Sequence, residues 1–120
     1  MELLHGIDLE QISRFERLAG KPCFLRGVYT PEEQARIRES ACPARKAAGL
    51  FSAKEAVSKA FGRGLYGMLP REIEILHDSH GRPLVRLHGQ AAAAYGAYTL
   101  SLSLSYKGDH VVSSCIAYLA

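Results

Sequence analysis

Two charged side chains near the middle of the sequence, Glu55 and Lys59, stand four residues apart, with Ser58 beside them. On a helix this spacing places both on one face, where a solvated ion pair would contribute roughly 0.2–0.5 kcal/mol. The same pair also suits chemistry on a phosphorylated substrate. Glu55 offers the hard oxygen that Mg²⁺ prefers, and Lys59 offers a mobile positive charge for a phosphate. The spacing alone leaves both interpretations open.

Asp8 is the second candidate, because it directly follows a short apolar segment at residues 3–7 that predicts a strand. A carboxylate at the end of a strand lies at a sheet edge, where ligands often bind. It also suits the N-cap of a helix, since Ile12 and Phe15 follow at helical spacing, and such a cap contributes about 1 kcal/mol. The two roles are compatible. One Asp and one Glu from separate elements can hold a Mg²⁺ whose remaining positions take water and phosphate oxygens.

Three other patterns do not indicate sites. The sequence G-x-G-x-x-G at residues 62–67 follows a predicted helix rather than a strand, so it is not a dinucleotide-binding fingerprint. His77 and His80 flank a predicted turn rather than a metal site. Tyr95 and Tyr98 lack an accompanying basic stripe, and a net charge of +3 is too small to indicate nucleic-acid binding.

Composition excludes several classes of protein. The 120 residues are 48% hydrophobic and 22% charged, which excludes a disordered or fibrous chain. Three cysteines without C-x-x-C spacing indicate neither a disulfide framework nor a zinc site. Residues 1–14 are too charged for a signal segment, and polar residues interrupt the uncharged stretch at residues 89–106. We expect a cytoplasmic protein without membrane partners, forming a single domain over residues 1–120.

The helices and strands that position the candidate residues follow from the spacing of apolar residues and from the capping and turn residues between them. A modest core in a chain of this length leaves little stability margin and favours oligomerisation. Helices dominate the first half and strands the second, so the fold class is α+β. Helices are predicted at residues 12–19 and 43–61, and another is predicted to begin at the capping box Thr30-Pro31-Glu32-Glu33. Strands are predicted at residues 73–77, 84–88, 99–106 and 111–119. In the third strand, leucines alternate strictly with serines, which predicts one apolar face.

Three motifs together resemble the holo-acyl-carrier-protein synthase group of 4′-phosphopantetheinyl transferases. They are H-G-I-D at residues 5–8, F-x-x-K-E-A-x-x-K-A-F-G-x-G at residues 51–64, and S-L-S at residues 103–105. The motifs come in the order and at close to the spacing of the family, and they span essentially the whole chain. The middle motif is the specific one, and it contains both Glu55 and Lys59.

The resemblance implies transfer of the phosphopantetheine arm of coenzyme A to a serine of an acyl carrier protein, releasing adenosine 3′,5′-bisphosphate. Such phosphoryl transfer depends on alignment and charge neutralisation. By resemblance, Asp8 and Glu55 would hold Mg²⁺ against the pyrophosphate. Glu55 would take the serine proton, directly or through a water, and Lys59 would neutralise charge on the leaving phosphate.

The resemblance also implies a small domain with a mainly antiparallel sheet, a long central helix and a homotrimeric assembly with each coenzyme A site at a subunit boundary. Arg14 and Leu18 match positions that contact the carrier protein, although Arg14 by itself reads as a solvated surface charge. Positions matching the coenzyme A site are Lys54, Ser58, Lys59, Gly62, Gly64, Ser105 and Tyr106.

Two departures from the family pattern bear on nucleotide binding. Leu50 stands where the family usually has Arg, and Tyr106 stands where it usually has His. Both family side chains lie close to coenzyme A, so Lys107 or Arg63 would have to replace the lost charge. The departures keep open a non-catalytic homologue that binds carrier proteins as a scaffold. Retention of Asp8, Glu55 and Lys59 argues against that alternative, because a non-catalytic copy would not need them.

Overall fold

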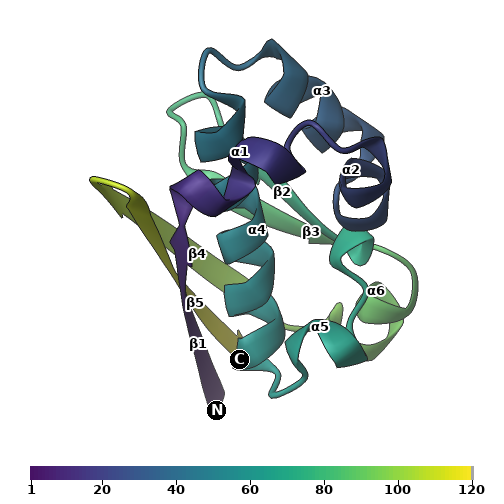
Figure 1. Ribbon diagram of the computed structural model, residues 1–120. Coiled ribbons are helices and arrows are strands. Elements are labelled where there is room, and N and C mark those ends of the chain that lie inside the picture. The colour runs from purple at the N-terminus through teal and green to yellow at the C-terminus, as the bar shows by residue number, and fades with distance from the viewer. Residues whose placement is uncertain (120) are drawn as a thin grey trace.

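One long helix, α4 (Pro43–Ala60), lies against a three-stranded antiparallel sheet with the strand order β1-β5-β4 (Figure 1). The computed structural model describes residues 1–119, except for the side chains of residues 65 and 66. The strands are β1 (Glu2–Gln11), β4 (Thr99–Lys107) and β5 (His110–Leu119). A second sheet is the hairpin of β2 (Ile73–His77) and β3 (Pro83–Leu87). The α+β class and the predicted antiparallel strands are therefore confirmed.

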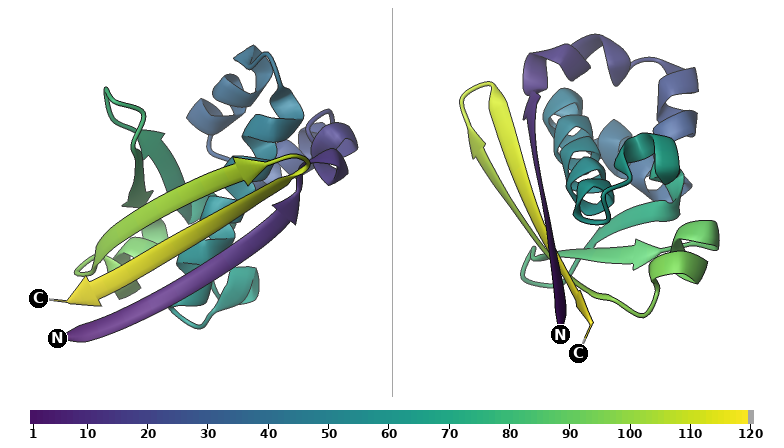
Figure 2. Two further views of the ribbon diagram at one scale, coloured as in Figure 1. Left: turned by 90° about the vertical axis from the view of Figure 1, so that its left-hand side faces the viewer. Right: turned by 90° about the horizontal axis from the view of Figure 1, so that it is seen from below.

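Shorter helices surround α4 on the sides that the three-stranded sheet leaves open (Figure 2). They are η1 (Ile12–Arg14), α1 (Phe15–Leu18), α2 (Pro22–Val28), α3 (Pro31–Glu39), α5 (Gly64–Gly67), η2 (Pro70–Glu72) and α6 (Gly89–Tyr95). The beginning of β1 and the end of β5 lie side by side because β1 pairs with β5 along its whole length (Figure 2). No helix in the described part of the chain is long and apolar enough to cross a membrane.

The capping box that begins α3 forms as predicted. The Thr30 hydroxyl accepts a hydrogen bond from the Glu33 amide at 3.2 Å, and the Glu33 carboxylate accepts one from the Thr30 amide at 2.9 Å. These two bonds satisfy amides that the first helical turn leaves without partners. The predicted helix at residues 43–61 is confirmed as α4, and Gly62 follows it with a positive φ of 68°.

Gly6 sets the approach of β1 to α4. A Cβ atom at this position would lie 2.1 Å from the carbonyl oxygen of Ala56, so only glycine fits. Asp8 lies two residues further along β1, and alternate residues of a strand share a face. The close approach at Gly6 therefore carries Asp8 against the same helix that bears Glu55 and Lys59.

Strand β1 is longer than the sequence predicts. It continues to Gln11, so Asp8 lies within the strand and not at its end. The N-cap interpretation of Asp8 is wrong, because the first helical turn begins at Ile12 and Gln11 precedes it. Helices α2 and α6 were not predicted, since seven-residue segments show too little periodicity to be recognised.

The alternating strand β4 directs its leucines toward the core, as expected for one apolar face. Leu102 is buried, and Leu100 and Leu104 pack partly buried against the core, while the serines are exposed. These leucines belong to the core of the protomer. The opposite face of the sheet instead exposes the apolar side chains of Leu3, Ile7, Leu9 and Ile116.

Candidate active site

Asp8 and Lys59 meet between β1 and α4. The Lys59 Nζ donates a hydrogen bond to Asp8 Oδ1 at 3.0 Å, although the two residues are far apart in the sequence. The carboxylate is almost fully buried, whereas the lysine side chain is 47% exposed. Among the described residues, Lys59 forms its ion pair with Asp8 and none with Glu55, so the interpretation as a solvated Glu55–Lys59 pair is wrong.

Glu55 lies close enough to this pair for their charges to act on it. Burial raises the pKa of the Glu55 carboxyl, and the Asp8 carboxylate raises it further, while Lys59 and Arg14 oppose the shift. The hydrogen bond to Asp8 raises the pKa of Lys59. Lys59 therefore stays charged at neutral pH. The Glu55 carboxylate is a stronger base than usual, and a group that accepts a proton during a reaction benefits from this property.

The second oxygen of Asp8 provides a test of whether a cation fits here. Asp8 Oδ2 is buried and accepts no hydrogen bond from a described amide, hydroxyl or ammonium group, and the Glu10 carboxyl lies beside the Asp8 carboxylate. A buried carboxylate oxygen without a partner is costly, and a bound cation would supply the missing partner. No cluster of three or more His, Cys, Asp or Glu side chains suited to a metal occurs in the described part of the chain. A site with only two carboxylates suits Mg²⁺, which retains waters and takes phosphate oxygens.

Glu10 is a neighbour that sequence reasoning missed. It lies on the same face of β1 as Asp8 and pairs with Arg14, with 3.0 Å between Oε1 and Nη1. Burial and the neighbouring Asp8 carboxylate raise the pKa of Glu10 to about 7. The alternation of Asp8 and Glu10 would have revealed this position if the strand had been predicted to reach Gln11.

Two buried serines, also missed, support Asp8 from α4 and β5. The Ser113 hydroxyl donates to Ser52 Oγ at 2.7 Å, and the Ser52 hydroxyl donates to the Asp8 carbonyl at 3.4 Å. Small polar side chains at these positions allow the helix, β1 and β5 to approach closely.

Lys54 and Ser58, which match positions of the nucleotide cleft by resemblance, are buried inside the protomer. The Lys54 side chain is 0% exposed and pairs with Glu33, with 2.7 Å between Nζ and Oε1. Its ammonium also donates to the carbonyls of Pro70 at 2.8 Å and Ile73 at 2.6 Å. Burial lowers the pKa of Lys54, and Glu33 counteracts the shift. Ser58 is also fully buried, and its hydroxyl has no partner among the described residues.

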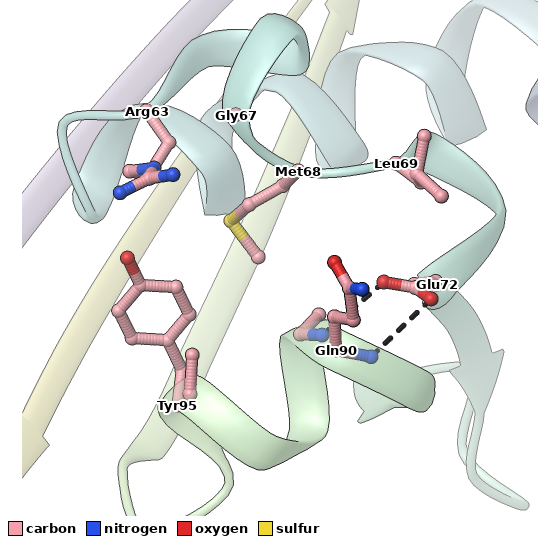
Figure 3. A pocket seen from close by; sticks show the side chains of 9 residues that line it. Arg63, Gly67, Met68, Leu69, Glu72, Gln90 and Tyr95 are labelled. Carbon is pink, nitrogen blue, oxygen red and sulfur yellow. Dashed lines mark hydrogen bonds between the residues drawn. The ribbon is translucent and has the colours of Figure 1, made fainter.

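Gly62 and Gly64 follow the end of α4, after its C-cap residue Phe61. Their φ angles of 68° and 58° lie in the left-handed region, which side chains disfavour. This segment leads into α5 and borders a cavity of about 330 Å³ between α5 and α6 (Figure 3). Arg63 and Tyr95 face each other across one end of that cavity (Figure 3).

Ser105 and Tyr106 lie on β4, at the opposite edge of the sheet from Asp8, with β5 between them. Ser105 is exposed on the outer face, and Tyr106 lies on the inner face beside Gly49. Within one protomer the structure therefore does not bring these two positions to Asp8 and Glu55.

Arg14 and Leu18 lie on η1 and α1, close to the site. The Arg14 guanidinium lies over the rings of Phe15 and Phe51, with its Cζ 5.6 Å and 5.9 Å from the ring centroids. The Arg14 side chain is 57% exposed and pairs with Glu10, so it is a surface charge with an ion-pair partner. Leu18 is half-buried against the core.

A family model for the 4′-phosphopantetheinyl transferase superfamily matches residues 5–115. The chain belongs to this superfamily. The holo-[acyl-carrier-protein] synthase of Caldanaerobacter subterraneus subsp. tengcongensis is 38% identical over 121 residues, covering 98% of this chain and 95% of that relative. The resemblance carried by the three sequence motifs is therefore confirmed, and the chain is a 4′-phosphopantetheinyl transferase.

Solved structures of other holo-[acyl-carrier-protein] synthases share the fold of this transferase. The enzyme from Neisseria meningitidis matches with a TM-score of 0.84 at 30% identity, covering 96% of this chain and 97% of that one. A coenzyme A complex from Chronobacterium ammoniagenes matches with a TM-score of 0.84 at 28% identity, covering 100% and 99% of the two chains.

Proposed function

We propose that the chain, acting as one domain over residues 1–120, transfers 4′-phosphopantetheine from coenzyme A to a serine of an apo acyl carrier protein. The other product is adenosine 3′,5′-bisphosphate, and the reaction depends on Mg²⁺. The observation that carries this proposal is the convergence of Asp8, Glu55 and Lys59, with Asp8 Oδ2 left without a partner. The relatives named as holo-acyl-carrier-protein synthases and the related coenzyme A complex support the choice of substrates.

In this proposal each residue has a separate task. Asp8 and Glu55 hold the Mg²⁺, which when bound neutralises the pyrophosphate of coenzyme A. Glu55 accepts the proton of the carrier serine, directly or through a water. Lys59 extends half-exposed from α4, held at one side by Asp8, and stabilises negative charge on the leaving phosphate. Gly62 and Gly64 allow the backbone to approach the nucleotide.

The direct test is intact-protein mass spectrometry of an apo acyl carrier protein incubated with this chain, coenzyme A and Mg²⁺. We expect the carrier to gain the mass of one phosphopantetheine, and we expect EDTA to prevent the gain. Fatty-acid, polyketide and peptide carriers are compared in parallel, which identifies the preferred class. No gain with any carrier would refute the proposal. It would favour the alternative suggested by Leu50 and Tyr106, a non-catalytic homologue that binds carrier proteins as a scaffold.

We propose that Arg14 and Leu18 contact the acidic surface of the carrier protein. Arg14→Glu is expected to raise the KM for the carrier about tenfold and to leave the KM for coenzyme A unchanged, because charge complementarity acts on the protein partner. Arg38→Glu, on the exposed side of α3, is the matched control. Steady-state kinetics with each substrate varied separately measure both constants. An unchanged carrier KM would remove Arg14 from the docking surface.

We also propose that the chain forms a homotrimer with each coenzyme A site at a subunit boundary. The outer face of the three-stranded sheet exposes Leu3, Ile7, Leu9 and Ile116, and apolar side chains clustered in this way indicate a protein contact. A site shared between two copies would also bring Ser105 and Tyr106 of one copy to the Asp8 of another. Native mass spectrometry is expected to show three chains, and a monomer at micromolar concentration would contradict the assembly.

A further inference from the structure

Two buried serines on different elements form a hydrogen-bonded chain that ends on the backbone of Asp8. Ser52 of α4 and Ser113 of β5 are both 0% exposed. The Ser113 hydroxyl donates to Ser52 Oγ at 2.7 Å, and the Ser52 hydroxyl donates to the Asp8 carbonyl oxygen at 3.4 Å. Ser113 is also the residue that pairs with Asp8 across β1 and β5. The chain of hydroxyls therefore joins α4, β5 and β1 at Asp8.

Ser52 lies on the same face of α4 as the two charged residues of the site. Glu55 follows Ser52 by three residues and Lys59 follows it by seven, and residues at these intervals line one side of a helix. Lys59 holds the Asp8 carboxylate at one end of this row, with 3.0 Å between Nζ and Oδ1. Ser52 holds the Asp8 carbonyl at the other end. These two bonds from one helix fix the position of Asp8 along α4, and therefore its position relative to Glu55.

Repulsion between carboxylates opposes this arrangement. Burial raises the pKa of Glu55, and the charge of the Asp8 carboxylate raises it further. Because Asp8 belongs to β1 and Glu55 to α4, this repulsion acts to separate the strand from the helix. Lys59 attracts Asp8, but its flexible side chain is 47% exposed and can follow the carboxylate if β1 moves. The chain of two serines is short and fully buried, so it resists such a movement, which would leave hydroxyl groups without partners.

We propose that Ser52 and Ser113 are positioning residues that hold Asp8 at the distance from Glu55 at which the two carboxylates bind Mg²⁺. This inference rests on the proposed function and deepens it, because it gives the metal site two residues that do not contact the metal. Ser52 acts on Asp8 directly, and Ser113 acts through Ser52. Alanine at both positions would nearly preserve the packing and would remove only the hydrogen bonds.

The test is calorimetric titration with Mg²⁺ in the presence of adenosine 3′,5′-bisphosphate, which does not require turnover. Ser52→Ala is expected to weaken Mg²⁺ binding about tenfold, at the lower end of the range for groups that orient a metal ligand. Ser113→Ala is expected to weaken it less, about threefold, because Ser52 can still donate to Asp8. In a Ser52→Ala background, Ser113→Ala should cause no further loss, since the two side chains act in series.

Cys115→Ala is the matched control. Cys115 is 0% exposed, lies on the same face of β5 two residues after Ser113, and pairs with Gly6 across the sheet. Its substitution removes one buried heavy atom, as each serine substitution does, and touches no hydrogen bond to Asp8. We expect this control to bind Mg²⁺ as the original chain does.

Urea denaturation provides a second readout of the hydrogen-bonded chain. Ser52→Ala leaves the Ser113 hydroxyl buried without an acceptor, and the double Ala variant removes that hydroxyl as well. The double variant is therefore expected to have a higher urea midpoint than Ser52→Ala, while the two bind Mg²⁺ equally weakly. A role in stability alone would lower the midpoints and leave the affinity for Mg²⁺ unchanged.

Steady-state kinetics separate positioning from chemistry. In Ser52→Ala the half-saturating concentration of Mg²⁺ should rise about tenfold, and kcat at saturating Mg²⁺ should stay within about twofold of the original chain. The reason is that excess Mg²⁺ restores the occupied site. A loss of kcat that excess Mg²⁺ does not restore would contradict positioning of a metal ligand.

Three titration results would overturn the inference. Unchanged Mg²⁺ affinity in Ser52→Ala would eliminate the positioning role. An equal loss in Cys115→Ala would show that any truncation of the buried face weakens the site. Additive losses in the double Ala variant would show that Ser113 does not act through Ser52. If the original chain binds Mg²⁺ and transfers nothing, the proposed function fails and the titrations still decide this inference; if it binds no Mg²⁺, both are refuted.

Discussion

Glu55→Gln is expected to reduce transfer by a factor on the order of 10²–10⁴, the range found when a group that accepts or donates a proton is removed. The substitution keeps the volume of the side chain and removes its charge. Glu55 then loses both proposed tasks, as a ligand of Mg²⁺ and as the base for the carrier serine. Initial rates by carrier mass spectrometry measure the loss of transfer. Calorimetric titration with Mg²⁺ in the presence of adenosine 3′,5′-bisphosphate measures the loss of Mg²⁺ binding without requiring turnover.

The matched control for Glu55→Gln is Glu32→Gln, an exposed glutamate in the first turn of α3. Both variants are expected to show the circular dichroism spectrum of the original chain. The control is expected to retain transfer and Mg²⁺ binding. If Glu55→Gln kept more than about a tenth of the rate, the activation barrier would have risen by less than about 1.4 kcal/mol. A rise that small would be too little for the loss of a metal ligand and would contradict the proposed role of Glu55.

Much of the fold could be predicted because local chemistry marks its boundaries. Helix α4 begins at Pro43 and is followed by Gly62 in the left-handed region, and α3 begins at its capping box. The hairpin of β2 and β3 turns where the Asp78 carboxylate accepts from the amides of His80 and Arg82. The full length of β1 could not be predicted. Its final residues alternate exposed apolar with buried acidic side chains, which reverses the usual pattern of a strand.

The candidate site was harder to predict than the fold because its pairings join distant parts of the chain. The spacing of Glu55 and Lys59 suggested an ion pair within one helix, and only the approach of β1 at Gly6 shows that Lys59 binds Asp8. Lys54 shows the same limitation. A lysine off the apolar stripe of a helix is expected to be exposed, and its burial depends on a carboxylate supplied by α3.

Lys54→Met is expected to lower the free energy of unfolding by about 3–5 kcal/mol, because it leaves the Glu33 carboxylate buried without its cation. Glu33 is 0% exposed and also accepts hydrogen bonds from the amides of Thr30 and Ile75. It therefore cannot move to solvent without disturbing α3 and β2. Urea denaturation at one fixed protein concentration measures the change, since an oligomer would make the stability depend on concentration.

Two comparisons separate this structural role of Lys54 from a role in binding coenzyme A. Lys107→Met, at an exposed lysine in β4, is expected to change stability by less than about 0.5 kcal/mol. In a Glu33→Gln background, Lys54→Met should cost much less than in the original chain, because the two side chains are energetically coupled. A lysine that bound the nucleotide would behave differently. Its substitution would raise the KM for coenzyme A and leave the urea midpoint unchanged. That pair of results would contradict the buried ion pair as the reason for a lysine at position 54.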